Sequence, residues 1–290
     1  MKPPPFEYHA VTTVEEALDL LAEHGDEAKI LAGGQSLVPL LALRLARPEY
    51  VVDINGVDSL GTFGHEDGLR LGALVRHRTV EKDGAITAGN PLVAAAARYI
   101  GHAAIRNRGT AGGTISHADP AAELPAVLVA LDGAVEAAST AGTRTVPASE
   151  FFKGFLTTAL APEEMVTAVR FPVWPARAGW SFQEFSRRNG DFAVAGAAVM
   201  LSIDEGGVVD GARIALSGMS DVPVRAAAAE ATLIGRVPSS EAWKEAAARA
   251  IADVEPPSDL HGSSAYRKHV AGGLVESALQ EAHERVGARA

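Results

Sequence analysis

Hydrophobic and polar positions along the chain repeat in ways that predict three successive units. The first unit starts with TVEEALDLLAEHG (residues 13–25), in which apolar residues recur at helical spacing. Thr13 and Glu16 are spaced as a capping box, and Gly25 is a typical helix end. This pattern predicts an amphipathic helix near the start of the chain.

The rest of the first unit is predicted to alternate strand, helix and strand. AKILA (28–32) and YVVDI (50–54) are short apolar runs typical of buried strands. Between them a glycine pair precedes a helix that Pro48 closes. One face of this helix is expected to carry Leu37, Leu40, Leu41 and Leu45.

The second unit contains both strand-like alternation and helix-like spacing of apolar residues. GLRLGALV (68–75) alternates as a strand should, and NPLVAAAARYIG (90–101) reads as a helix with Asn90 as N-cap and Pro91 at its first position. A second glycine pair follows, and then a helix expected to open at Asp119-Pro120. Three further β-like pieces are AVEAAST (134–140), TRTVPA (143–148) and EEMVTAVRFPV (163–173).

Strands come first and helices second in the third unit. WSFQEFSRR, FAVAGAAVMLSI and GARIALSGM precede two long helical segments, 241–254 and 265–286. This order predicts an α+β domain with an antiparallel sheet. The proline-rich FPVWPARAG (171–179) is the best linker candidate. We therefore expect domains at 1–57, 58–174 and 175–290.

Composition narrows the function classes. The 290 residues carry 36 acidic and 26 basic side chains, a formal charge of −10, which argues against a nucleic-acid surface. The chain has no cysteine, so it forms no disulfide and holds no thiolate-ligated zinc or iron–sulfur cluster. Its nine histidines form no metal-binding pattern, and we expect no metal site. Any redox group held by this chain must be an organic cofactor.

The two glycine pairs are the candidate chemistry. LAGGQS (31–36) and TAGGTIS (110–116) place glycines and hydroxyl residues between an extended segment and a helix. Such loops expose backbone N–H groups, and glycine lets an oxygen-rich ligand approach the main chain. A phosphate or diphosphate suits them, although neither matches GxGxxG or GxxxxGK[ST]. Bare strand-to-helix turns are the alternative interpretation.

Five stretches in order and spacing carry a family resemblance. They are LAGGQSLVPLLALRLARP, RNRGTAGGTISHADPAAELP, FFKGFLTTAL, RRNGDFAVAG and PPSDLHGSSAYRKHVAGGLV. Together they resemble the FAD-binding medium subunit of molybdenum hydroxylases, most closely the aerobic carbon monoxide dehydrogenase type, from Phe6 to about Ala278. The resemblance implies a two-subdomain FAD-binding fold, like that of vanillyl-alcohol oxidase and PCMH proteins, followed by the C-terminal α+β domain.

The resemblance also implies FAD contacts, position by position. It assigns no catalytic residue to this chain. The first phosphate loop and the helix behind it match Ala32, Gly33, Gly34, Gln35, Ser36 and Leu37, with Lys29 shortly before. The second loop matches Thr110, Ala111, Gly112, Gly113, Thr114 and Ser116. Glu123 stands where the family has an acidic residue near the adenosine ribose, Leu160 at an apolar contact, and Phe192 at an aromatic beside the flavin ring.

Two positions depart from the family pattern. The carbon monoxide enzymes have tyrosine where this chain has Phe192, and many relatives have lysine where it has Glu184. The second change puts a lysine contact to the flavin in doubt. Phe192 could alternatively be a plain core residue. His77 and His117 fall near the inferred cofactor groove, but their spacing indicates no catalytic role.

The resemblance implies a division of labour among subunits. A large partner oxidises substrate at a molybdenum cofactor, a small partner carries two [2Fe–2S] clusters, and this chain passes electrons from FAD to an external acceptor. We expect a cytoplasmic dimer of heterotrimers, and a quinone acceptor would bring it into peripheral membrane contact. Two alternatives are a free-standing FAD oxidoreductase and a nucleotide-binding module without redox activity.

Overall fold

The N-terminal unit contains a small parallel sheet. The computed structural model describes residues 2–286. Strands β1 (Glu7–Ala10) and β2 (Ala28–Leu31) both pair in parallel with β3 (Tyr50–Asp53), which lies between them. Helix α1 (Val14–His24) begins with the expected capping box and is followed by the 3-10 turn η1 (Gly25–Glu27). The first glycine pair leaves β2 and leads into α2 (Leu37–Ala42).

The central unit is built on a five-stranded antiparallel sheet. Its strand order is β4-β5-β10-β6-β7. The strands are β4 (Phe63–Gly64), β5 (Leu69–Gly72), β6 (Ala134–Ser139), β7 (Gly142–Pro147) and β10 (Met165–Phe171). A small hairpin of β8 (Phe152–Gly154) and β9 (Thr157–Thr158) stands beside it.

Short helices cover this sheet. They follow η2 (Asp58–Gly61) and are α3 (His77–Lys82), α4 (Gly84–Gly89), α5 (Pro91–Ala97), α6 (Ala103–Arg106), α7 (Ala111–His117), α8 (Glu123–Ala130) and α9 (Ala148–Phe151). Asn90 caps α5 by accepting from the Val93 N–H at 3.3 Å, and Pro91 takes the first helical position, as the sequence indicates.

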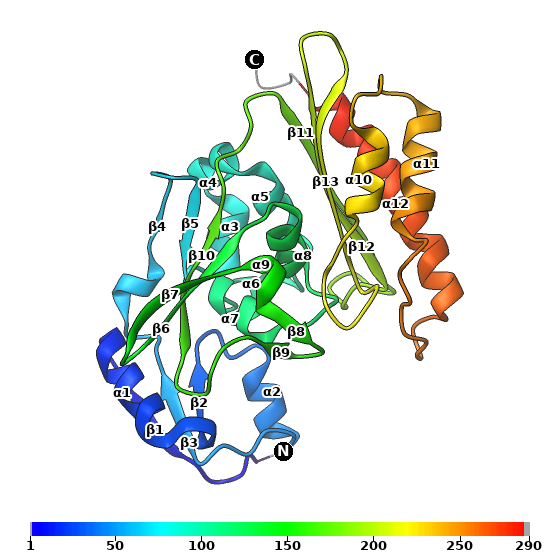
Figure 1. Cartoon of the computed structure of the whole chain (residues 1–290). Helices are drawn as coiled ribbons and strands as arrows, with labels where there is room; N and C mark the ends of the chain where they lie inside the picture. Colours follow the sequence, from blue (N-terminus) through cyan, green and yellow to red (C-terminus); the bar gives the residue numbers. More distant parts are fainter. Residues whose placement is uncertain (1, 287–290) are drawn as a thin grey trace.

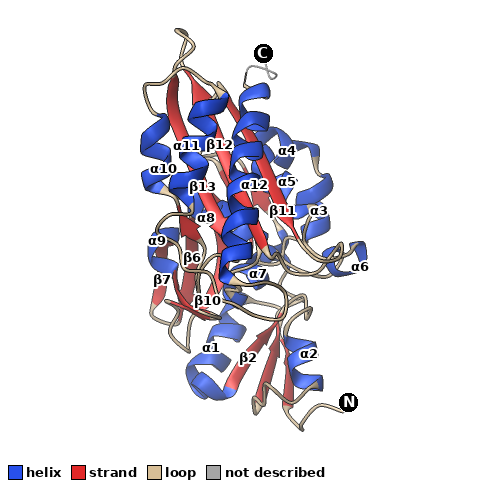
Figure 2. Cartoon of the chain, turned by 90° about the vertical axis from the view of Figure 1, so that its right-hand side faces the viewer, coloured by secondary structure: helices blue, strands red, loops and turns tan. Residues whose placement is uncertain are grey.

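The C-terminal unit is an antiparallel sheet with helices on one face. Figure 2 shows α10 (Ala227–Leu233), α11 (Ser240–Ala250) and α12 (Ser264–Glu284) lying against it. Its strands, in spatial order, are β11 (Ala178–Phe185), β12 (Ala195–Ile203), β13 (Val209–Ser217) and β14 (Val224–Arg225). The predicted α+β class and the strands-then-helices order are confirmed.

Both faces of this C-terminal sheet are buried, which joins it to the central unit. On β12, Val199 and Leu201 belong to the core shared with α10–α12, whereas Ala198 and Met200 belong to the core shared with the central helices. Figure 1 shows α5 and α8 between the two sheets. A strand buried on both faces has no polar alternation. This explains the continuous apolar run AGAAVMLSI.

Two predicted helices start or end at other residues. Helix α2 ends at Ala42, and Arg44 takes a left-handed φ of 59°, so Leu45 is 72% exposed and not on a buried face. Helix α8 starts at Glu123, because the Asp119 side chain accepts from the Ala121 N–H at 2.9 Å and stabilises a separate turn. Among residues 2–286, no helix is long and apolar enough to cross a membrane.

Candidate functional site

The two glycine loops meet. A Cβ atom placed on Gly33 would lie 2.4 Å from the carbonyl oxygen of Arg108 and 2.8 Å from the Cα atom of Gly109. Both distances are far below a normal van der Waals contact, so any residue larger than glycine would push the loops apart. The backbone of the first loop therefore packs directly on the entry to the second.

Two polar side chains hold this junction in place. Asn55 follows β3 and donates its side-chain amide to the Ala32 carbonyl at 2.8 Å. Arg76 donates to Asn55 Oδ1 at 2.7 Å and also to the Arg108 carbonyl. Arg76 thus connects both loops and places a positive charge beside them. Neither residue is predicted from the sequence, since neither belongs to a motif and only the fold brings them together.

The first loop has unused backbone donors. Within residues 2–286, the five consecutive N–H groups from Gly33 to Leu37 donate no hydrogen bond. Gly34 has a φ of +71°, a conformation that favours glycine. The Gln35 side chain donates to the Gly33 carbonyl at 2.9 Å, which fixes the turn. Consecutive free N–H groups of this kind form a concave anion-binding site.

The second loop differs from the sequence expectation. Its glycines lie inside the first turn of α7, with Thr110 as N-cap. The Ala111 and Gly112 N–H groups donate to Val75 and Ala73 carbonyls, each at 2.9 Å, and the Gly113 N–H donates to Thr110 Oγ1 at 3.1 Å. The predicted set of free N–H groups is therefore wrong for this loop.

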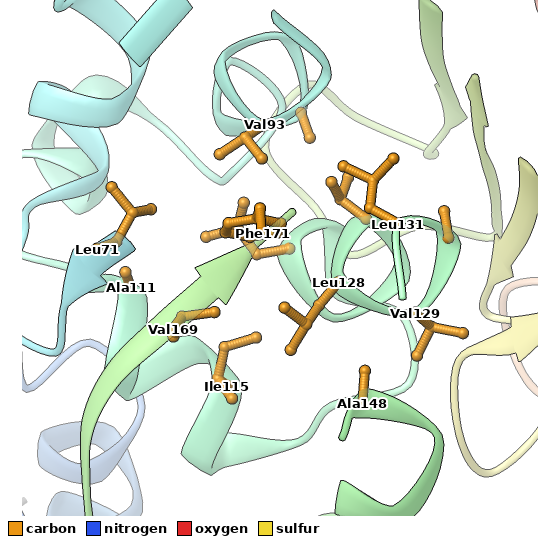
Figure 3. Close-up of a cluster of buried hydrophobic side chains, with 14 of the residues drawn as sticks. Leu71, Val93, Ala111, Ile115, Leu128, Val129, Leu131, Ala148, Val169 and Phe171 are labelled. Atoms are coloured by element: carbon orange, nitrogen blue, oxygen red, sulfur yellow. The ribbon is translucent and has the colours of Figure 1, made fainter. Parts of the chain in front are cut away.

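Packing explains the second glycine pair. A Cβ on Gly112 would lie 2.6 Å from the Cβ of Ala73, and a Cβ on Gly113 would lie 2.7 Å from Thr110 Oγ1. The buried face of α7 carries Ala111 and Ile115, which lie close to Leu71 and Val169 of the central sheet in Figure 3. The loop offers hydroxyl groups instead: Thr114 is partly exposed and Ser116 is exposed.

A buried and a partly buried carboxyl group lie between the central and C-terminal units. Glu123, the first residue of α8, is 6% exposed, and Glu184 near the end of β11 has a buried Oε2 with no hydrogen-bond partner among the described residues. Burial raises the pKa of Glu123 to about 7, with Asp119 adding to the shift. Burial and the Glu123 charge raise the pKa of Glu184 to about 9.

The other predicted contacts lie on three separate segments. Phe192 is 60% exposed in the β11–β12 loop, so it is not a core residue. A Cβ on Gly190 of that loop would lie 2.5 Å from the His102 ring, which precedes α6 and the second glycine loop. Leu160 follows β9 and packs partly buried against the central core. Lys29 is exposed on β2, just before the first loop.

These features fit a dinucleotide cofactor. A diphosphate requires N–H donors and a main chain without obstructing side chains, which the Gly33–Leu37 segment provides beside the Arg76 charge. Among residues 2–286, no group of three or more acidic or histidine side chains is placed to hold a metal ion. The free N–H groups and the Arg76 charge are suited to an anion.

Comparisons with known proteins indicate one family along nearly the whole chain. The family model described as the FAD binding domain in molybdopterin dehydrogenase matches residues 4–174, and that of the CO dehydrogenase flavoprotein C-terminal domain matches residues 180–282. The 6-hydroxypseudooxynicotine dehydrogenase complex subunit alpha of Paenarthrobacter nicotinovorans is 43% identical, with 98% of this chain and 97% of the relative covered.

A solved carbon monoxide dehydrogenase is among the structures that match this chain. The medium chain from Hydrogenophaga pseudoflava is 38% identical, with 98% of this chain and 99% of the relative covered. The solved carbon monoxide dehydrogenase of that organism, which lacks the Mo-pyranopterin moiety, superposes with a TM-score of 0.96 at 40% identity and covers 99% of this chain and 100% of that chain. The chain belongs to the family of FAD-binding medium subunits of molybdenum hydroxylases.

Proposed function

We propose that this chain is the electron-transfer subunit of a molybdenum hydroxylase complex. In this proposal it receives electrons from [2Fe–2S] clusters in a small partner subunit, after substrate oxidation at a molybdenum cofactor in a large one. It then passes them to an external acceptor. The observation that carries the cofactor assignment is the run of five N–H groups at Gly33–Leu37 that have no acceptor among the described residues, next to the entry of the second loop.

The chain's own composition supports a complex. It has no cysteine to ligate an iron–sulfur cluster, so the clusters must be held by other chains. The relatives are named as a complex subunit alpha and a medium chain, which are parts of larger enzymes. Bound FAD supplies a redox group that exchanges electrons singly with clusters and in pairs with a two-electron acceptor.

The residues of the site have separate proposed tasks. The first loop binds the diphosphate through its N–H groups, and the Thr114 and Ser116 hydroxyls face the same ligand. Glu123 binds the ribose, because carboxyl oxygens can accept hydrogen bonds from the ribose hydroxyls. Lys29 adds a positive charge near the diphosphate. Leu160 and the exposed Phe192 give the flavin ring apolar contacts. We further propose that 1–57, 58–174 and 175–290 act as the three units of the chain.

The substrate is not selected by this chain. The relatives named above belong to a 6-hydroxypseudooxynicotine dehydrogenase in one case and a carbon monoxide dehydrogenase in the other, and both resemble this chain along nearly its full length. A subunit that carries the flavin and not the molybdenum centre has no need to contact the substrate. We therefore assign the reaction class and leave substrate choice to the large partner.

The test is to isolate the tagged chain from its native host with the chains that accompany it. Candidate substrates are then added without oxygen, while the flavin absorbance is followed. We expect the flavin to bleach in the complex and to stay oxidised when the FAD-loaded chain is treated alone. Bleaching of the isolated chain would instead identify a free-standing oxidoreductase. A chain that binds nucleotide without flavin would identify a non-redox module.

A further inference from the structure

His77 lies behind the second glycine loop and touches it at two places. Its side chain is 1% exposed at the start of α3. Its Nε2 atom is 2.9 Å from Thr114 Oγ1. A Cβ on Gly109 would lie 2.7 Å from its Cδ2 atom, so the ring also packs against the loop backbone. The ring therefore connects the start of α3 to the hydroxyl that the second loop offers to a ligand.

The imidazole is neutral, which leaves it a single N–H group. Burial lowers the pKa of His77 to about 3, and the nearby Arg106 and Arg76 charges act in the same direction. Its Nδ1 atom is buried and has no hydrogen-bond partner among residues 2–286. A proton on Nδ1 would be an orphaned buried donor, which is rare in folded proteins. The proton therefore belongs on Nε2, where it is donated to Thr114 Oγ1.

This donation determines what the Thr114 hydroxyl can do. A hydroxyl group has one proton to donate and two lone pairs to accept with. His77 occupies a lone pair, and Thr114 Oγ1 has no second hydrogen-bond partner among the described residues. A threonine inside a helix often donates to the carbonyl four residues earlier. Here the Thr110 carbonyl accepts the Thr114 N–H at 3.1 Å, and no hydroxyl bond to it is present among residues 2–286. The hydroxyl proton is thus left for an acceptor outside the chain.

We propose that His77 is a positioning residue of the cofactor site, which directs the Thr114 hydroxyl proton toward an anionic oxygen of the bound dinucleotide. The inference rests on the proposed FAD site and adds a role for a residue that makes no direct ligand contact. A ring whose Nε2 atom acts as an acceptor would not serve. If His77 Nε2 accepted from the Thr114 hydroxyl, that hydroxyl proton would be donated within the protein and could not reach the ligand.

The experiment measures FAD affinity of the full-length apo chain by flavin fluorescence. Four variants are compared: His77→Phe removes the donor and keeps a ring, His77→Gln keeps a side-chain N–H, Thr114→Val removes the hydroxyl at nearly constant shape, and Thr114→Ser keeps it. We expect His77→Phe and Thr114→Val each to raise Kd about tenfold. His77→Gln and Thr114→Ser are expected to stay within about threefold of the parent chain.

The double variant decides whether the two residues act together. If His77 acts through Thr114, His77→Phe adds little in the Thr114→Val background, because the hydroxyl it orients is already gone. Equal weakening in both backgrounds, or no weakening by His77→Phe, overturns the inference. Circular dichroism and the Tm of the apo chain check folding. If His77→Phe does not fold, a Kd for His77→Gln as high as that of Thr114→Val overturns it instead. Failure of the parent chain to bind FAD would reject the proposed function itself.

Discussion

Gly33 is the residue on which the contact between the two loops depends most directly. An added methyl group there meets backbone atoms, which cannot rotate away as a side chain can. We expect Gly33→Ala to separate the loops and to raise the Kd for FAD about tenfold or more, while the distant cores keep the chain folded. Fluorescence titration of the apo variant measures this.

Gly61→Ala is the matched control for that substitution. A Cβ at Gly61 meets no described atom within 4 Å, and its φ is not in the left-handed region. Its FAD affinity should equal that of the parent chain. Equal affinity for Gly33→Ala as well would mean that the junction between the loops does not shape the site.

Glu184 makes the stability of the apo chain depend on pH. Burial raises its folded pKa to about 9 from an ordinary value of 4.5, so between these values the folded chain binds more protons than the unfolded chain. Stability therefore falls as pH rises through this window. Glu184→Gln removes the cost of keeping this carboxyl group protonated in the folded chain, and we expect its apo Tm to exceed that of the parent by about 2–4 °C at pH 8, with little difference at pH 4.5.

A surface carboxylate controls for the loss of one negative charge. Glu205 is exposed in the β12–β13 turn, so Glu205→Gln should leave Tm nearly unchanged at both pH values. A Glu184→Gln variant that is less stable than the parent at pH 8 would contradict the buried-acid assignment.

The two glycine pairs show what a local pattern can and cannot predict at the residue scale. Their family resemblance is confirmed, and the sequence correctly indicated that the loops could converge. The need for Gly112, however, comes from Ala73 on another segment, and the Ala111 and Gly112 donors are used by that same segment. A contact between residues about forty positions apart leaves no local signature, and the same holds for Arg76 and Asn55.

At the scale of single elements, α2 gives the sharpest contrast between pattern and structure. The sequence placed Leu41 and Leu45 on one buried face, whereas the structure buries Leu41 to 5% exposure and leaves Leu45 at 72%. We expect Leu41→Ala to lower the unfolding free energy by about 2–5 kcal/mol and Leu45→Ala to change it by less than about 0.5 kcal/mol. Urea unfolding of both variants measures this. Comparable losses would contradict the helix end at Ala42.

Helix starts were predictable where the cap is local. Thr13 and Glu16 form the capping box, and Asn90 and Pro91 open α5, because each cap needs only residues within the same turn. The start of α8 could not be predicted in this way, because Asp119 forms a separate turn before the helix. Short elements such as α3, α6 and β14 have too few residues to show a period and depend on tertiary packing.

At the scale of the whole molecule, the C-terminal sheet is both a domain core and an interface. Its Phe182, Ala198 and Met200 belong to the same core as the central helices, and α12 covers its other face. This arrangement places the β11–β12 loop with Phe192 next to the segment that enters the second glycine loop. The C-terminal unit thus reaches the proposed cofactor region and also shares a core with the central unit.

The most direct test of the central claim is the cofactor content of the chain taken from its native complex. The complex is dissociated, and flavin, iron and molybdenum are measured for each separated chain. We predict one FAD per copy of this chain, with iron and molybdenum found only on the other chains. A chain that carries no flavin, and takes up none from excess FAD, would contradict the account.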